Sequence, residues 1–267
     1  MRLSDIVIIL SRPSEPGNVG AVCRVMKNMG LSRLRLVGPP PTEEGLVRAR
    51  AVHAGDIWER VSCFDTLSGA AADCSLLVGT TRRRGRRRKN VTMDPRTLAA
   101  WLRNRPGGGQ VALVFGNERT GLEDAELDLC NAASHIPVSE AFPSLNLSHA
   151  VQVYAYELFL ALGQASAGAD GNAGTAGGGV LGGGAFPAGH APVKGAWVPL
   201  NRAQVEELAA SITDTLAGLG FYKHPGREMQ TRFLQDLISR AGLASREGKY
   251  LADIFAKAAR LGARRAP

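Results

Sequence analysis

Five short apolar runs in the first 162 residues constrain the fold more than any other feature of the sequence. They are rich in Val, Ile and Leu, and longer segments with helical periodicity separate them. A nearly continuous apolar run is typical of a strand buried on both faces. The pattern predicts an α/β domain with a mostly parallel sheet covered by helices. We expect the strands at 5–10, 34–38, 75–79, 111–116 and 134–138.

The composition changes after residue 162. Twelve of the 33 residues at 163–195 are glycine, and most of the rest are Ala, Ser or Pro, so we expect a flexible linker there. Three helices should follow, the first capped by Asn201, the second over about 226–241 and the third from about Ser245. Their apolar stripes predict that they pack together in a small bundle. The predicted organisation is a domain at 1–162, a linker at 163–195 and a helical extension at 196–267.

No apolar run is long enough to cross a bilayer, and the N-terminal run resembles a first strand more than a signal peptide. We therefore expect a cytoplasmic protein without a membrane partner. The four cysteines lack C-x-x-C spacing, which indicates neither a zinc site nor a disulfide framework, and no metal is expected. Cys23 should be a small buried hydrophobic residue.

The positive charge is concentrated in two places. The run RRRGRRRK at 82–89 carries +7 and residues 221–267 carry +6, whereas the whole chain carries +8. The remaining residues are therefore net acidic. This distribution favours a polyanionic partner over a generally adhesive surface.

The first segment with candidate chemistry is RPSEPGNVGAVCRVMKNMG at 12–30. It follows the first strand and opens a helix at about Asn18. Helical spacing places Gly20 on the same face as Arg24, opposite the apolar face. Gly20 should leave room for a bulky ligand one turn before Arg24. An exposed helix face with ordinary cations explains the spacing equally well.

Two further segments follow predicted strands. ALVFGNERTGL at 112–122 ends a strand at Gly116, and ligands of open α/β sheets bind beyond the carboxyl ends of strands, where Asn117 and Glu118 could face them. A plain polar loop is the alternative. HIPVSEAFPSLNLSHAVQVYAYELFLAL at 135–162 leads into a long helix that Ser144 or Asn146 could cap, although one cap would suffice.

Taken together and in this order, the three segments resemble the SPOUT superfamily of knotted methyltransferases. More narrowly, they are similar to the branch of tRNA enzymes that methylate the ribose 2′-hydroxyl at position 32 of the anticodon loop. The resemblance covers residues 5–162, and the C-terminal helices resemble the extension of that branch. It implies an α/β sheet whose C-terminal part forms a deep trefoil knot, a homodimer, and a tRNA substrate with cytidine or uridine as the target.

The resemblance also implies that S-adenosylmethionine is the cofactor and S-adenosylhomocysteine the product. It assigns three residues to catalysis: Arg24, Ser144 and Asn146. It assigns the following residues to cofactor binding: Thr80, Thr81, Arg82, Gly116, Ile136, Pro143, Ser144 and Leu145. Asn18 and Arg24 should face RNA, and the arginine-rich run should guide RNA to the site through Arg83, Arg84, Arg86, Arg87, Arg88 and Lys89.

Arginine stays protonated in proteins, so Arg24 should clamp a phosphate and stabilise a developing alkoxide instead of acting as a base. Two alternatives stay open: a 2′-O-methyltransferase of ribosomal RNA, and a catalytically silent RNA-binding protein of the same fold. The arginine-rich run could also be a solvated loop without a binding role.

Overall fold

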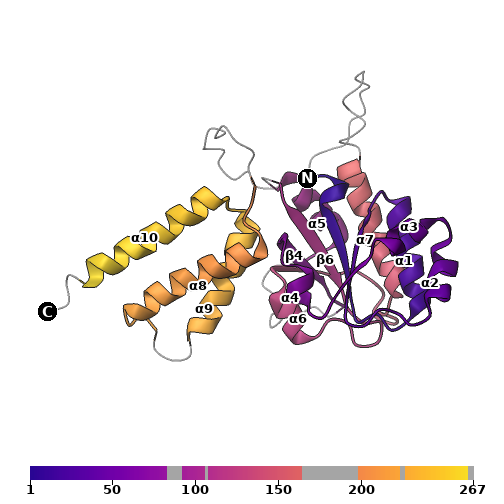
Figure 1. Ribbon diagram of the computed structural model, residues 1–267, viewed down its shortest axis with the longest axis horizontal. Helices are drawn as coiled ribbons and strands as arrows, with labels where there is room; N and C mark the ends of the chain where they lie inside the picture. The colour runs from indigo at the N-terminus through magenta and orange to yellow at the C-terminus, as the bar shows by residue number, and fades with distance from the viewer. Residues whose placement is uncertain (83–91, 106–107, 164–197, 223–225, 264–267) are drawn as a thin grey trace, which may run out of the picture.

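The computed structural model describes residues 1–82, 92–105, 108–163, 198–222 and 226–263. Residues 83–89 of the arginine-rich run and 164–195 of the expected linker lie outside this part of the chain. The described residues form an α/β body and a three-helix extension beside it (Figure 1).

The body is built on a seven-stranded sheet with the order β3-β2-β1-β6-β4-β7-β5, and every described strand pair is parallel. Parallel neighbours require crossover connections, and helices supply most of them here. The strands are β1 (Ile6–Ser11), β2 (Arg33–Val37), β3 (Ser62–Phe64), β4 (Cys74–Thr80), β5 (Thr92–Met93), β6 (Gln110–Phe115) and β7 (Ala132–Ser134).

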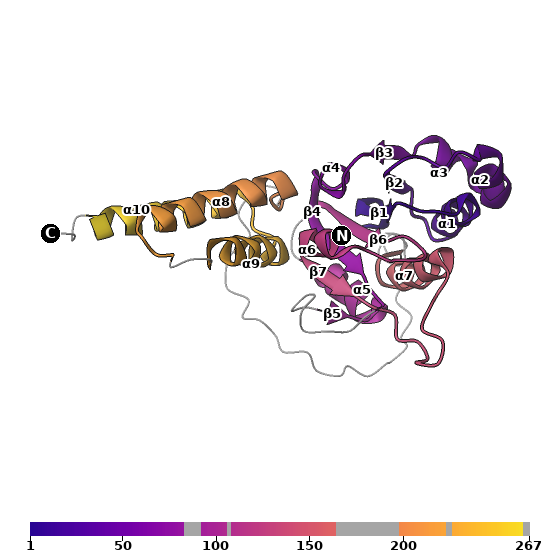
Figure 2. The ribbon, with the colours of Figure 1, turned by 90° about the horizontal axis from the view of Figure 1, so that it is seen from below.

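Helices cover both faces of the sheet (Figure 2). Ile6, Ile8 and Leu10 of β1 point into a core shared with α1, α2, α3, α5 and α7, whereas Val7 and Ile9 point into a second core under α4 and α6. The body helices are α1 (Pro16–Asn28), α2 (Glu44–Ala51), α3 (Gly55–Glu59), α4 (Leu67–Ala70), α5 (Pro95–Asn104), α6 (Asp124–Leu129) and α7 (Leu147–Leu162), with short 3-10 turns at Leu3–Asp5 and Val52–Ala54.

The predicted α/β class is confirmed, and all five predicted strands are present within a few residues of their expected positions. The sequence reading missed β3 and β5. β3 is three residues long and largely exposed, and β5 is two residues long, so neither produces an apolar run. The knot stays a prediction.

The expectation for Gly20 was wrong. Gly20 is buried, and a Cβ atom there would lie 2.1 Å from the Val47 carbonyl oxygen and 3.0 Å from the Ala51 nitrogen of α2. The glycine therefore lets α1 and α2 approach each other closely, and leaves no room for a ligand. Arg24, one turn further along, is exposed as expected.

The extension contains three helices at the predicted places: α8 (Arg202–Gly218), α9 (Gly226–Ala241) and α10 (Ser245–Ala263). Asn201 caps α8, accepting a hydrogen bond from the Gln204 nitrogen at 3.0 Å. The extension has a small core of its own, which includes Val205, Leu208, Ile212 and Ile238.

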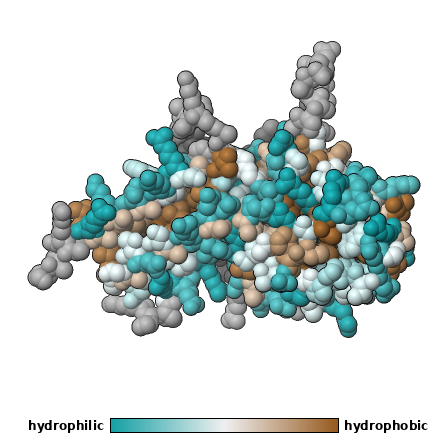
Figure 3. Space-filling model, viewed as in Figure 1, coloured by the Kyte–Doolittle hydropathy of each residue, from teal (hydrophilic) through white to brown (hydrophobic). Residues whose placement is uncertain are grey.

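The predicted packing of the apolar stripes is only partly correct. Ile238 is buried, but Met229 and Phe233 of α9 and Tyr250 and Ile254 of α10 are exposed. Periodicity identifies an apolar face but not what covers it, and the three short helices have one small core between them. Figure 3 shows apolar surface along these helices.

Two buried arginines join the extension to the body. The Nη2 atom of Arg105, after α5, donates a hydrogen bond to the Ser239 carbonyl near the end of α9 at 2.9 Å. The Nη1 atom of Arg202 donates to the Leu129 carbonyl at the end of α6 at 2.7 Å. Cations stabilise helix C-termini, where carbonyl groups lack partners. Burial lowers the pKa of Arg105 to about 10.

Among the described helices, none is long and apolar enough to span a membrane.

Replacing Gly20 by Ala tests the contact between α1 and α2. The added Cβ would collide with backbone atoms, so we expect the free energy of unfolding to fall by about 1–3 kcal/mol in denaturant titrations. Gly45→Ala is the control, because a Cβ at Gly45 of α2 meets nothing within 4 Å and should be neutral or stabilising. Equal stabilities of the two variants would contradict the packing described for Gly20.

Candidate functional site

A cavity of about 440 Å³ opens at the carboxyl ends of β4, β6 and β7. Four chain segments line it: the end of β4 at Thr80, the turn after β6, the residues just after β7, and the loop that leads into α7. The carboxyl edge of a parallel sheet is where ligands of α/β proteins bind.

All eight residues that the resemblance assigns to cofactor binding line this cavity. They come from positions 80–82, 116, 136 and 143–145, which are far apart in the chain. Asn117 and Glu118, which the sequence also placed to face a ligand, line the cavity as well. The sequence did not assign the rest of the lining, which consists of Phe115, Arg119, Thr120, Gly121, Leu122, Val138, Leu147, Ala150 and Tyr154.

The turn after β6 is held in one shape. A Cβ atom at Gly116 would lie 2.1 Å from the Gly121 carbonyl carbon and from the Leu122 nitrogen, so the turn closes on the bare glycine. The Gly121 nitrogen donates to the Asn117 carbonyl at 2.8 Å, and Gly121 has a φ of +72°.

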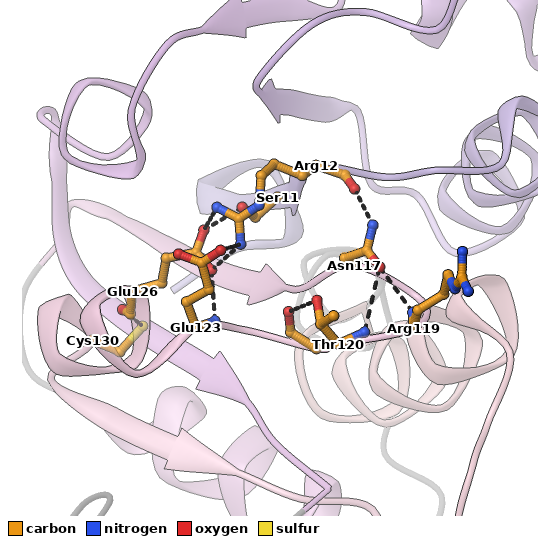
Figure 4. Close-up of polar contacts among 9 residues, drawn as sticks. Ser11, Arg12, Asn117, Arg119, Thr120, Glu123, Glu126 and Cys130 are labelled. Carbon is orange, nitrogen blue, oxygen red and sulfur yellow. Dashed lines mark hydrogen bonds and ion pairs between the residues drawn. The ribbon is translucent and has the colours of Figure 1, made fainter.

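The Asn117 side chain extends this fixation (Figure 4). Its Oδ1 atom accepts hydrogen bonds from the nitrogens of Arg119 and Thr120 at 2.9 and 3.4 Å, and its Nδ2 atom donates to the Arg12 carbonyl at 2.7 Å. Asn117 therefore connects the β6 turn to the β1 turn. Its side chain therefore stabilises the two turns, in addition to lining the cavity as the sequence suggested.

Glu118 lines the cavity, but its carboxylate is directed to the start of α1. It accepts hydrogen bonds from the nitrogen and hydroxyl of Ser14, both at 2.9 Å, and from the Asn18 side chain at 2.8 Å. Burial raises the pKa of Glu118, but these hydrogen bonds outweigh burial and the net shift is downward. The Asn18 amide in turn accepts a hydrogen bond from Asn146 Nδ2 at 2.8 Å.

The three predicted catalytic residues occupy different positions. Ser144 lines the cavity and is exposed. Asn146 lies outside the lining and caps α7, accepting hydrogen bonds from the Ser148 nitrogen and hydroxyl at 2.9 and 2.7 Å. Arg24 is exposed on α1, also outside the lining, and its guanidinium forms no hydrogen bond or ion pair with any residue that the structure describes.

Sequence reasoning missed an ion pair beneath the site (Figure 4). Arg12, with a φ of +49°, donates from Nη1 and Nη2 to the two carboxylate oxygens of Glu126 at 2.9 and 2.8 Å. Ser11 donates to the same carboxylate, and Glu123 lies 3.1 Å from Arg12 Nη2. The pair joins residues that are 114 positions apart in the chain. The one sequence signal for it is that Arg12 begins the segment at 12–30.

Cys23 is buried, as predicted, and burial raises the pKa of its thiol to about 12. Among the described residues, no group of three or more His, Cys, Asp or Glu side chains could hold a metal ion.

Comparison with known proteins gives a consistent result. The family model described as the SpoU rRNA Methylase family matches residues 5–156. A Pseudomonas aeruginosa protein named tRNA (cytidine/uridine/adenosine-2′-O-)-methyltransferase TrmJ is 44% identical over 160 residues, which cover 60% of this chain and 62% of that relative. A Methanocaldococcus jannaschii tRNA (cytidine-2′-O-)-methyltransferase TrmJ is 37% identical over 156 residues, covering 58% and 67%. The match thus spans about three fifths of the bacterial relative's length.

Two solved structures resemble nearly the whole chain. TrmJ from Z. mobilis ZM4 has a TM-score of 0.67 and 26% identity, covering 94% of this chain and 98% of its own. A probable methylase family protein from Haemophilus influenzae has a TM-score of 0.58 and 30% identity, covering 97% of both chains. The similarity therefore extends into the helical extension.

Replacing Glu126 by Gln tests the pair beneath the site. The Glu126 side chain is 9% exposed, so the variant leaves the Arg12 guanidinium beside a neutral amide in a partly desolvated place. We expect the free energy of unfolding to fall by about 1–3 kcal/mol. Glu123→Gln is the matched control, since Glu123 is 63% exposed and should change stability by about 0–1 kcal/mol. Denaturant unfolding measures both, and a control variant as unstable as Glu126→Gln would be inconsistent with this account.

Proposed function

We propose a function from one premise: this chain belongs to the SpoU rRNA Methylase family, whose model matches more than half of it. The proposed function is S-adenosylmethionine-dependent methylation of a ribose 2′-hydroxyl in tRNA, with cytidine or uridine at position 32 of the anticodon loop as the target. The relatives of 37–44% identity, which are named as tRNA 2′-O-methyltransferases, support tRNA as the substrate.

One observation carries the proposal. The eight residues implied by the family resemblance come from four separate segments, and all of them line a single cavity at the carboxyl edge of the sheet. Asn18 and Asn146 lie next to each other beside this cavity through their hydrogen bond to one another. Chance would not bring the implied residues of four segments to one place.

The cavity fits a nucleoside cofactor in size and chemistry. Its volume of about 440 Å³ falls within the range of pockets for drug-sized ligands. Its walls combine the apolar side chains of Ile136, Leu145 and Leu147 with the turn at Gly116, a mixture suited to an adenine ring and to hydrogen bonds from the backbone. When bound, S-adenosylmethionine supplies a methyl group that its sulfonium already activates.

Arg24 has the features of a residue that binds RNA. Its guanidinium is exposed and forms no hydrogen bond or ion pair within the described part of the chain, so it can receive a phosphate of the substrate. Arginine binds phosphate through two parallel hydrogen bonds. A cation held there also stabilises the negative charge that develops on the ribose 2′-oxygen as its proton leaves to solvent.

The other predicted catalytic residues hold the site in shape or face the cavity. Asn146 fixes the start of α7 and bonds to Asn18, which Glu118 positions in turn. Ser144 lines the cavity, where its hydroxyl can orient the nucleophile or the cofactor. These contacts hold the start of α1, and so Arg24, relative to the cavity.

RNA binding should also involve the extension, which we assign to residues 196–267 after a linker at 163–195. Arg246, Lys249, Lys257 and Arg260 of α10 are exposed and have no ion pair within the described residues. By contrast, Arg227 and Arg232 of α9 pair with Asp214 and Asp128. The run at 83–89 would add further cations.

The proposed assembly is a homodimer in the cytoplasm. Tyr156, Phe159 and Leu160 lie three and four positions apart on α7 and are 48%, 42% and 39% exposed. Aromatic and aliphatic side chains grouped on one helix face are typical of a protein interface. This face of α7 is therefore the proposed contact between subunits.

Incubation with isotopically labelled S-adenosylmethionine and unmodified tRNA tests the function. We expect transfer to one ribose of the anticodon loop, located by mapping alkali-resistant positions. Transfer to ribosomal RNA with none to tRNA would refute the tRNA assignment and retain the reaction. Absence of S-adenosylhomocysteine binding by calorimetry would instead favour a silent RNA-binding protein.

Replacing Arg24 by Lys tests its role in this reaction. Lysine keeps the charge but loses the paired hydrogen bonds, so we expect methyl transfer to fall by roughly 10²-fold while S-adenosylhomocysteine affinity stays unchanged. Arg103→Lys is the control, because Arg103 is exposed on α5 and does not line the cavity. Near-full turnover of Arg24→Lys would rule out the paired clamp.

A further inference from the structure

Among the cations around the cavity, Arg119 combines a backbone fixed by hydrogen bonds with a guanidinium that pairs with no described residue. It lines the cavity, is exposed, and its guanidinium forms no hydrogen bond or ion pair with any described residue. In Figure 4 the side chain extends away from Asn117, and the only bond drawn to Arg119 reaches its backbone nitrogen.

The backbone of Arg119 is fixed at both sides. Its nitrogen donates to Asn117 Oδ1 at 2.9 Å, and the Gly121 nitrogen donates to the Asn117 carbonyl at 2.8 Å. Asn117 itself donates to the Arg12 carbonyl at 2.7 Å. A side chain that starts from a fixed backbone loses less conformational entropy when it binds a ligand than one on a mobile loop.

The charge of Arg119 is not neutralised within the cavity wall. Glu118 is the one carboxylate among the lining residues, and its oxygens accept hydrogen bonds from Ser14, Glu15 and Asn18. Arg12, on the other side of the same turn, is saturated by Glu126 and Glu123. The wall therefore offers an anion the guanidinium of Arg119, and that of Arg82 at the edge of the described segment.

A cofactor with an amino-acid end brings one anionic group, its carboxylate, into such a cavity. Burying a carboxylate is costly unless a cation or several donors receive it. A guanidinium matches a carboxylate with two parallel hydrogen bonds. Resting on the proposed function, we propose that Arg119 binds the carboxylate at the amino-acid end of S-adenosylmethionine and thereby orients the cofactor in the cavity.

Isothermal titration calorimetry with two ligands tests the assignment. S-adenosylhomocysteine carries the carboxylate, whereas 5′-deoxy-5′-methylthioadenosine has the same nucleoside thioether without the amino-acid end. We expect Arg119→Gln to weaken S-adenosylhomocysteine about tenfold and to leave methylthioadenosine unchanged, since one charge-assisted contact is worth about that factor. Arg119→Lys should lose less, and the control Arg103→Gln should change neither ligand.

Three results would overturn the proposal. Unchanged S-adenosylhomocysteine affinity in Arg119→Gln would show that the carboxylate does not need this residue. An equal loss for both ligands would mean that the substitution disturbs the turn. A loss of tRNA affinity at unchanged S-adenosylhomocysteine affinity would assign Arg119 to RNA. Failure of the cofactor assignment in the proposed function looks different, because the unmodified chain would then bind neither nucleoside, whereas a different RNA substrate would leave both affinities unchanged.

Discussion

The arrangement of the site depends on the hydrogen bonds that the carboxylate of Glu118 accepts. Glu118 follows β6, yet its hydrogen bonds reach Ser14 and Asn18 about 100 positions earlier in the chain. Through Asn18 it also holds Asn146, the cap of α7. One carboxylate thereby connects the three segments that carry the candidate chemistry. Since hydrogen bonds to a charged group are stronger than those between neutral groups, the ionised form of Glu118 is the one that fixes this geometry.

The body of the fold could be predicted because its signals are local. Each long strand is an apolar run of its own, and each helix of the extension has its cap or stripe in the sequence, as Asn201 illustrates. What could not be predicted is how one element covers another. Gly20 has the spacing of an open helix face, yet α2 packs on it, and no pattern within α1 encodes that contact. Met229 and Tyr250 show the opposite case: they belong to apolar stripes that were expected to be covered, yet their side chains are exposed.

The site divides in the same way. The lining at Thr80, Gly116 and Ile136 was assigned from whole motifs in their order, because no single segment distinguishes a ligand site from a polar loop. Arg12 and Glu126 were not assigned, because an ion pair between positions 114 residues apart leaves no mark on either segment. Arg119 was missed for a different reason. Its motif was recognised, but the sequence does not reveal that Glu118 is engaged elsewhere and leaves a neighbouring cation unpaired.

The state of each arginine therefore distinguishes structure from function in this molecule. Arg12 is saturated by carboxylates, and Arg105 and Arg202 donate to the carbonyls of Ser239 and Leu129 and so join the extension to the body. At the ends of α9 and α6 a guanidinium donates to helix carbonyl groups that lack a partner within the helix. Arg24 and Arg119 have no such partners among the described residues, although each starts from a backbone that the network around Glu118 and Asn117 holds firmly. A cation that starts from a fixed backbone and has no described protein partner can receive an anion from outside; Arg119 does so from the cavity wall, and Arg24 from α1, outside the lining. Two such cations suit the proposed reaction, in which a cofactor that carries a carboxylate meets a polyanionic RNA.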